Sequence, residues 1–245
     1  MNSNIVSYVL QYAGFLTEVA LVFYLAWSGR WKRQSGVSLY LACLLVADAA
    51  RASVWHRYGL ESREYFYVYW STDFLLVISA FLLVSSLFRC ACRDKKEMWS
   101  LIRRLLVFVF VLVVVISGLI FSHKYAALFP HFVYEFNQNL YFACLVLNTL
   151  LYLLLQYIES ADDQLGLLVC GVGIQFAGPA ATLALLHLTA AERFVQSLNS
   201  FIMRFCTFGM LLVWAYAITC VKEKATRVTR REIPVLAEAT ADLNV

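Results

Sequence analysis

Six ionisable side chains lie inside long apolar runs of this sequence, where a charged group is costly unless it faces a partner. They are Glu18, Asp48, Arg51, Asp73, Glu135 and Arg204. Residues of this kind within apolar helices usually face the interior of a bundle and line ligand or ion paths. Four acids oppose two bases, so the set has an acidic surplus when every group is ionised. We therefore predict a buried polar cluster.

Two charge pairs follow from spacing and depth. Asp48 and Arg51 are three residues apart, so they share one helix face and can pair. Asp73 and Arg204 lie about 12 Å and about 13 Å from the same end of their helices, counting 1.5 Å per residue. Because these two groups have similar depth and opposite charge, we predict a direct contact between Asp73 and Arg204.

Neutral polar residues extend the cluster. Asn139 follows Glu135 by one helical turn, and Asn199 precedes Arg204 by a little more than one turn. The predicted ligand or ion pocket consists of Asp48, Arg51, Asp73, Glu135, Asn139, Asn199 and Arg204, with Glu18, Asn148 and Gln175 placed deeper. Buried polar contacts also hold helices together without binding anything. A purely structural network therefore stays open as the alternative.

Several kinds of chemistry lack the residues that they need. No lysine lies within a helix core, and no GxSxG or Walker motif occurs. The four histidines are not joined by an HxxxH or HExxH spacing; they are His56, His123, His131 and His187. We therefore expect no enzyme activity, no catalytic residue, no metal site and no cofactor.

The elements that position these residues are long apolar helices. Hydrophobic residues make up 62% of the 245 residues and charged residues 15%, against about 45–50% and about 25% in soluble domains. Each apolar run is long enough for a helix of about 20 residues to cross a bilayer. Seven runs qualify: 5–27, 37–57, 65–88, 100–121, 132–157, 165–188 and 196–221. The predicted fold is all-α, an integral membrane seven-helix bundle over residues 1–221 with a short cytoplasmic tail at 222–245.

Basic residues predict the orientation of this bundle. With the N-terminus outside, fourteen Lys and Arg residues fall in the cytoplasmic segments 28–36, 89–99, 158–164 and 222–245 together with the start of the fourth helix, and four fall in the outer segments. Positive residues accumulate on the cytoplasmic side of membrane proteins. The C-terminus is thus expected in the cytoplasm, and the lipid bilayer is the expected partner. A net charge of +4, spread over helix ends, indicates no nucleic-acid partner.

The segment Tyr67-Val-Tyr-Trp-Ser-Thr-Asp73, followed by an apolar stretch ending in Leu87-Phe88-Arg89, resembles a group of bacterial membrane proteins. These are acidobacterial-type proteins with seven transmembrane helices, in which an aromatic-rich third helix also ends in Phe-Arg. The resemblance implies a multi-pass protein of the bacterial inner membrane. It brings no activity and no site residue to this chain.

Three functions compete. The first is a receptor-like or sensory module with an outward-facing polar pocket, acting through a separate partner that docks at loops 89–99 and 158–164. The second is a small transporter or channel with a 3+1+3 helix plan, although no Pro-Gln pair typical of such sugar transporters occurs. The third is an accessory subunit of a larger complex, and oligomers are compatible with all three. A transporter requires a polar path reaching both sides, whereas a receptor requires a pocket closed below.

Overall fold

The computed structural model describes the backbone of residues 2–29, 31, 34–59, 62–93, 95–123, 130–158, 162–188 and 201–220. Within these ranges it describes all side chains except those of residues 2–8, 96, 120–123, 130–132, 134–135, 179 and 182–188. The predicted tail at 222–245 therefore lies outside the described residues, as does residue 199.

The described part of the chain is all-helical and contains seven helices. Six of them are α1 (Asn2–Trp27), α2 (Ser35–Tyr58), α3 (Arg63–Ala91), α4 (Lys96–His123), α5 (Pro130–Tyr157) and α6 (Asp163–Leu188). The seventh is the segment Phe201–Cys220, called the last helix below. Every predicted span overlaps one of these helices. α1 to α6 extend their predicted ranges by a few residues, whereas the last helix as described lies within its predicted range of 196–221.

Local side chains fix where α3 and α6 begin. Gly59 takes a positive φ of 79° after α2, a conformation that costs little only for glycine. Ser62 then caps α3, because its Oγ accepts a hydrogen bond from the Tyr65 amide at 3.1 Å. Asp162 does the same for α6 by accepting from the Leu165 amide at 3.2 Å. Asp162 belongs to the loop predicted as a docking surface, and here it serves the helix start.

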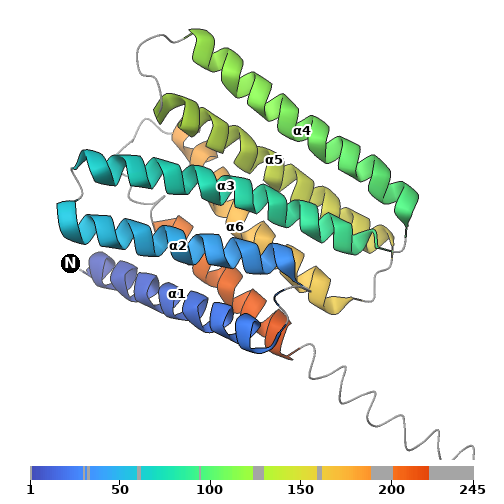
Figure 1. The fold of residues 1–245 in the computed structure, drawn as a ribbon, viewed down its shortest axis with the longest axis horizontal. Helices are drawn as coiled ribbons and strands as arrows, with labels where there is room; N and C mark the ends of the chain where they lie inside the picture. The colour runs from blue at the N-terminus through green and yellow to red at the C-terminus, as the bar shows by residue number, and fades with distance from the viewer. Residues whose placement is uncertain are drawn as a thin grey trace, which may run out of the picture.

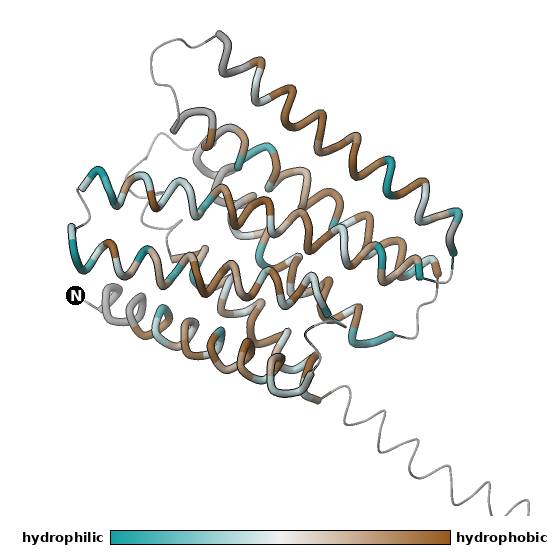
Figure 2. Tube along the Cα trace, in the orientation of Figure 1, coloured by the Kyte–Doolittle hydropathy of each residue, from teal (hydrophilic) through white to brown (hydrophobic). Residues whose placement is uncertain are grey.

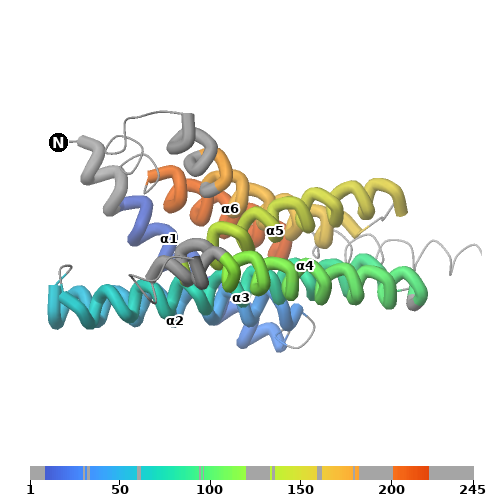
Figure 3. Tube along the Cα trace, turned by 90° about the horizontal axis from the view of Figure 1, so that it is seen from above, coloured from blue at the N-terminus to red at the C-terminus, as the bar shows by residue number. Residues whose placement is uncertain are grey.

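The helices form two layers. Figures 1 and 3 show α2, α3 and α4 side by side in one layer, with α5, α6 and the last helix in the other. α3 packs against α2 and α5 and touches α4 and α6, so it is the central helix of the bundle. α4 lies at one edge, where it contacts α5 and α3. The polar side chains of α3 are therefore the ones best placed to meet several neighbours.

Close packing marks the half of the bundle in which α2 and α6 begin, which we call the packed end. A Cβ atom added at Gly171 of α6 would lie 2.6 Å from Nε1 of Trp214, so only glycine fits there. Trp214 is fully buried, and its Nε1 donates a hydrogen bond to the Leu168 carbonyl at 3.0 Å. The Trp214 ring also meets the Tyr40 ring edge-on at 5.9 Å. These contacts join α2, α6 and the last helix.

Six helices of the described part are long and apolar enough to cross a membrane. They are Val9–Trp27, Ser35–Tyr58, Arg63–Ala91, Glu97–Leu119, Phe136–Tyr157 and Phe201–Cys220, and the apolar stretch of α6, Asp163–Gly178, is shorter. Figure 2 shows hydrophobic residues along the middle of the helices and hydrophilic ones gathered toward their ends. A chain with this many apolar helices has the architecture of a multi-pass membrane protein.

Candidate ligand site at the polar end

Asp73 of α3 is the centre of the polar cluster. Its Oδ1 lies 3.5 Å from Nη2 of Arg51 in α2, and its Oδ2 accepts a hydrogen bond from Nδ2 of Asn137 in α5 at 2.5 Å. Three helices thus meet at one carboxylate. The Arg51 and Asp73 side chains are 21% and 23% exposed, so both can still reach a ligand. We call the half that holds these residues the polar end.

Arg51 is positioned by more than its acidic partner. Its Nε donates to Thr72 Oγ1 at 2.8 Å, and its guanidinium carbon lies 4.5 Å from the centre of the Tyr69 ring. A guanidinium over an aromatic face gains about 0.5–2 kcal/mol, more when water is excluded. Nη2 also lies 3.4 Å from the Tyr69 carbonyl oxygen. The guanidinium is therefore fixed against one turn of α3, with one edge turned to Asp73.

The predicted direct pair between Asp73 and Arg204 stays a prediction. Asp73 takes Arg51 and Asn137 as its partners, whereas Arg204 acts electrostatically on Asp48. The predicted pairing of Asp48 with Arg51 is found only as an electrostatic interaction. Depth along a helix does not decide which groups meet, because that also depends on the rotation of each helix.

Asn137, rather than Asn139, completes the site. The inward face of α5 carries Val133, Phe136, Leu140, Cys144, Leu147 and Leu151, all buried at spacings of three or four residues. Asn137 lies on this stripe and is 5% exposed. Asn139 lies two residues further, about 200° around the helix, and donates to Ser117 of α4 at 3.2 Å. The spacing of the apolar residues of α5 is the signal in the sequence that distinguishes the two.

The site contains an unsatisfied acceptor. The Asn137 side chain donates to Asp73, but its own Oδ1 is buried with no hydrogen-bond partner. Leaving a buried acceptor unpaired costs about 1–3 kcal/mol. A ligand donor or an ordered water that reached Oδ1 would remove this cost, so the cluster is better suited to binding than a fully satisfied network.

The deeper polar residues fall into two groups. Glu18 of α1 is 2% exposed and interacts electrostatically with Asp48. Asn148 of α5 instead donates to the Val169 carbonyl of α6 at 3.3 Å, close to Gly173. Gln175 is 7% exposed with an unpaired Oε1. Asn148 therefore serves helix packing, whereas Glu18 extends the acidic part of the cluster.

Two predicted pocket residues cannot be placed. Asn199 lies outside the described residues, and Glu135 occupies a described position of α5 whose side chain is not described. Among the described side chains, no group of three or more His, Cys, Asp or Glu residues is placed to hold a metal ion.

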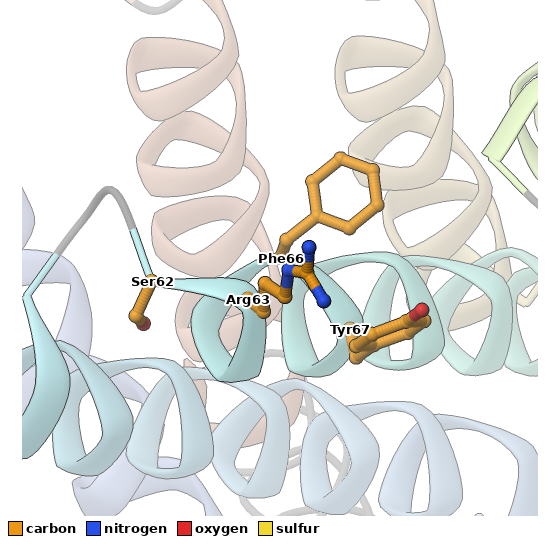
Figure 4. A pocket seen from close by; sticks show the side chains of 4 residues that line it. All are labelled: Ser62, Arg63, Phe66 and Tyr67. Carbon is orange, nitrogen blue, oxygen red and sulfur yellow. The ribbon is translucent and has the colours of Figure 1, made fainter.

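A shallow hollow lies beyond the polar cluster, at the first turns of α3. Ser62, Arg63, Phe66 and Tyr67 line it, and the Arg63 side chain lies between Phe66 and Tyr67 (Figure 4). Its volume is about 350 Å³, and none of the predicted pocket residues lines it. Tyr69, whose ring carries the Arg51 guanidinium, lies two residues beyond Tyr67 on α3.

Comparison with known proteins adds no family or relative, so the architecture alone defines the class of this protein. No protein-family model, no curated protein and no solved structure matches this chain. The chain is therefore assigned by its six apolar helices to the multi-pass helical membrane proteins.

Proposed function

We propose that this protein is a receptor-like membrane module that binds a small polar ligand at Arg51, Asp73 and Asn137. The proposal takes the chain as a seven-span bundle of the bacterial inner membrane, with its N-terminus outside and the polar end facing outward. A cytoplasmic partner would read the bound state at loops 89–99 and 158–164.

The observation that carries the proposal is the contrast between an accessible ion pair and a closed floor. Arg51 and Asp73 each keep about a fifth of their side chains exposed. Two turns deeper along α3, Ser79 is 3% exposed and donates back to the Leu76 carbonyl at 2.8 Å. Below it, Tyr40 and Trp214 fill the space between the layers. A polar site closed below is the feature expected of a receptor.

The ligand chemistry follows from the two exposed groups. Asp73 offers a carboxylate to a positive or donating group, and Arg51 offers a guanidinium to a carboxylate or another acceptor. Their contact is a single one of 3.5 Å, which a ligand with both kinds of group can replace by two shorter ones. A zwitterion such as a free amino acid has this chemistry.

A thermal unfolding assay in lipid nanodiscs tests the proposal. Glycine, glutamine, betaine and taurine serve as zwitterionic probes, at equal ionic strength. At least one is expected to raise the melting temperature of the wild type, because a ligand that binds only the folded state stabilises it. Asp73→Asn and Arg51→Gln should each abolish that shift. The exposed Glu97→Gln should keep it, and an equal shift in all variants would contradict the assignment.

A small transporter is the second candidate, and the position of Glu18 favours it. Glu18 lies nine residues from the end of α1 at Trp27, about 14 Å into the bundle. Buried carboxyl groups at this depth are typical of ion-coupled transporters. Uptake of a zwitterion into proteoliposomes, rather than binding alone, would decide for this candidate.

A further inference from the structure

A cluster of basic residues surrounds the connection between α3 and α4. Arg89 lies in the last turn of α3, Arg93 and Lys95 lie in the connection, and Arg103 and Arg104 lie in α4. All five side chains are exposed, and Figure 2 shows hydrophilic residues on both helices close to this connection. Neither Arg89 nor Arg103 has an ion-pair partner among the described side chains. The cluster therefore carries positive charge that a negatively charged group could balance.

A ring contact between α3 and α4 fixes the level of two of these arginines. The rings of Phe81 in α3 and Phe110 in α4 meet, with 5.2 Å between their centres. Arg89 follows Phe81 by eight residues, about 12 Å along α3. Arg103 precedes Phe110 by seven residues, about 11 Å along α4 in the opposite chain direction. Because side chains lean toward the N-terminus in every helix, each arginine leans as the ring on its own helix does, and the two arginines lie at the same level.

The rotation of both helices places these arginines on one side of the α3–α4 pair. At about 100° per residue, Arg89 is turned about 80° and Arg103 about 20° away from the ring contact, toward the same side. Leu82 and Val107 lie on this side and are 46% and 59% exposed. Leu106 lies on the other side of α4 and is buried. The two arginines thus stand at one end of an exposed apolar surface that both helices share.

We propose that Arg89 and Arg103 together bind the phosphate of one anionic phospholipid, whose acyl chains lie along Leu82 and Val107. Guanidinium groups form strong, paired hydrogen bonds with phosphate oxygens. A phospholipid also supplies the apolar chains that this surface can take up, which a soluble phosphate compound lacks. An anionic headgroup complements the two positive charges, whereas a zwitterionic headgroup brings a further positive charge close to them.

The lipid site is separate from the zwitterion site and does not depend on it. Asp73 and Arg89 are 16 residues apart on α3, about 24 Å. A lipid held by Arg89 and Arg103 would join α4, the helix at the edge of the bundle, to the central helix α3. Arg93 and Lys95 of the connection are left for the proposed cytoplasmic partner.

Native mass spectrometry of the full chain, released from detergent micelles, tests this inference. Phosphatidylglycerol is the anionic probe, and phosphatidylcholine with the same acyl chains is the zwitterionic control. The wild type should retain one phosphatidylglycerol more tightly than phosphatidylcholine. Arg89→Gln and Arg103→Gln should each weaken phosphatidylglycerol binding at least about tenfold, as expected for the loss of a hydrogen bond to a charged group.

Arg104→Gln is the matched control, because it removes the same charge from the next residue of α4, about 100° further around the helix. Its loss should be no more than about fivefold, the effect of one basic residue near an anionic surface. Equal losses in Arg103→Gln and Arg104→Gln would overturn the proposal, since charge alone would then attract the lipid. Displacement of the lipid by soluble glycerophosphoglycerol would also overturn it and assign the site to a free phosphate compound. Failure of the wild type to prefer phosphatidylglycerol would contradict it as well and leave both arginines to the proposed protein partner.

Discussion

The two ends of this bundle differ in side-chain packing and in the exposure of polar groups, although the same helices form both. At the packed end, the Trp214 ring lies directly against Gly171. The indole nitrogen of Trp214 donates a hydrogen bond to the Leu168 carbonyl. At the polar end, Arg51 and Asp73 stay partly exposed and Asn137 keeps an unpaired oxygen. The Trp214 contacts therefore characterise one half of the bundle, and a partly exposed ion pair characterises the other.

This division has a physical reason. Helices inside a bilayer gain little from burying apolar surface against one another, so close packing of small and large residues must hold them together. A site with unpaired polar groups costs stability, and the packed end offsets that cost. Mutations at the packed end should accordingly lower the stability of the protein, and mutations at the polar end should change its ligand binding.

The largest effect is expected for Trp214→Ala. Removing this fully buried indole leaves a cavity and removes its hydrogen bond to the Leu168 carbonyl, which should lower the free energy of unfolding by about 3–5 kcal/mol. Trp27→Ala is the matched control, since Trp27 is 83% exposed. Chemical unfolding in mixed micelles measures both. Equal losses for the two tryptophans would break the comparison between the ends.

Two glycines of α6 should respond to alanine substitution with smaller changes in stability that are opposite in sign to each other. Gly171→Ala should lower the free energy of unfolding by about 1–3 kcal/mol, because the added methyl group overlaps the Trp214 ring. Gly166→Ala meets nothing within 4 Å and should stabilise the helix by up to about 1 kcal/mol. The same unfolding assay applies. A stabilising effect of Gly171→Ala would show that the packed end can accommodate a methyl group beside Trp214.

A double-mutant cycle sharpens the account of the polar end. Asp73→Ala and Arg51→Ala should together cost less than the sum of the single changes, with a coupling of about 0.5–3 kcal/mol. The cycle of Asp73→Ala with Arg204→Ala should be additive within about 0.5 kcal/mol, because Asp73 is paired with Arg51. Strong coupling in the second cycle and none in the first would reverse the assignment of partners.

The smallest effect concerns the two asparagines of α5. Asn139→Ala removes one hydrogen bond to Ser117, worth about 0.6 kcal/mol between membrane helices. It should leave the zwitterion response of the wild type intact. Asn137→Ala should weaken that response, because it removes a partner of Asp73. A loss of binding in Asn139→Ala alone would place the site between α4 and α5 instead.

Helix positions were predictable from the sequence, because the length of an apolar run that can cross a bilayer is set by membrane thickness. The depths predicted for Asp73 and Arg204 came from the same count. The pairing of Asp73 with Arg51 was not predicted, since counting along a helix gives depth but not rotation. For α5, the rotation follows from the spacing of the buried residues, which include Phe136 and Leu140, and Asn137 lies on the same face of the helix. For the last helix, residues near Asn199 lie outside the described part.

The close fit at Gly171 was also beyond prediction. The sequence shows several small residues in α6, namely Gly166, Gly171, Gly173 and Gly178. Each lets a neighbour approach, but only the tertiary arrangement reveals which one meets a large side chain. Gly166 meets nothing, whereas Gly171 meets Trp214, 43 residues further along the chain.

Cysteine accessibility tests the central contrast most directly, in a chain whose seven native cysteines are replaced. Thr72→Cys at the polar end and Ser79→Cys two turns deeper are placed one at a time on α3, in vesicles of known orientation. A membrane-impermeant thiol reagent should label Thr72→Cys from the outer side only and Ser79→Cys from neither side. Labelling of Ser79→Cys from the cytoplasmic side, or of Thr72→Cys from both sides, would contradict a polar site closed below.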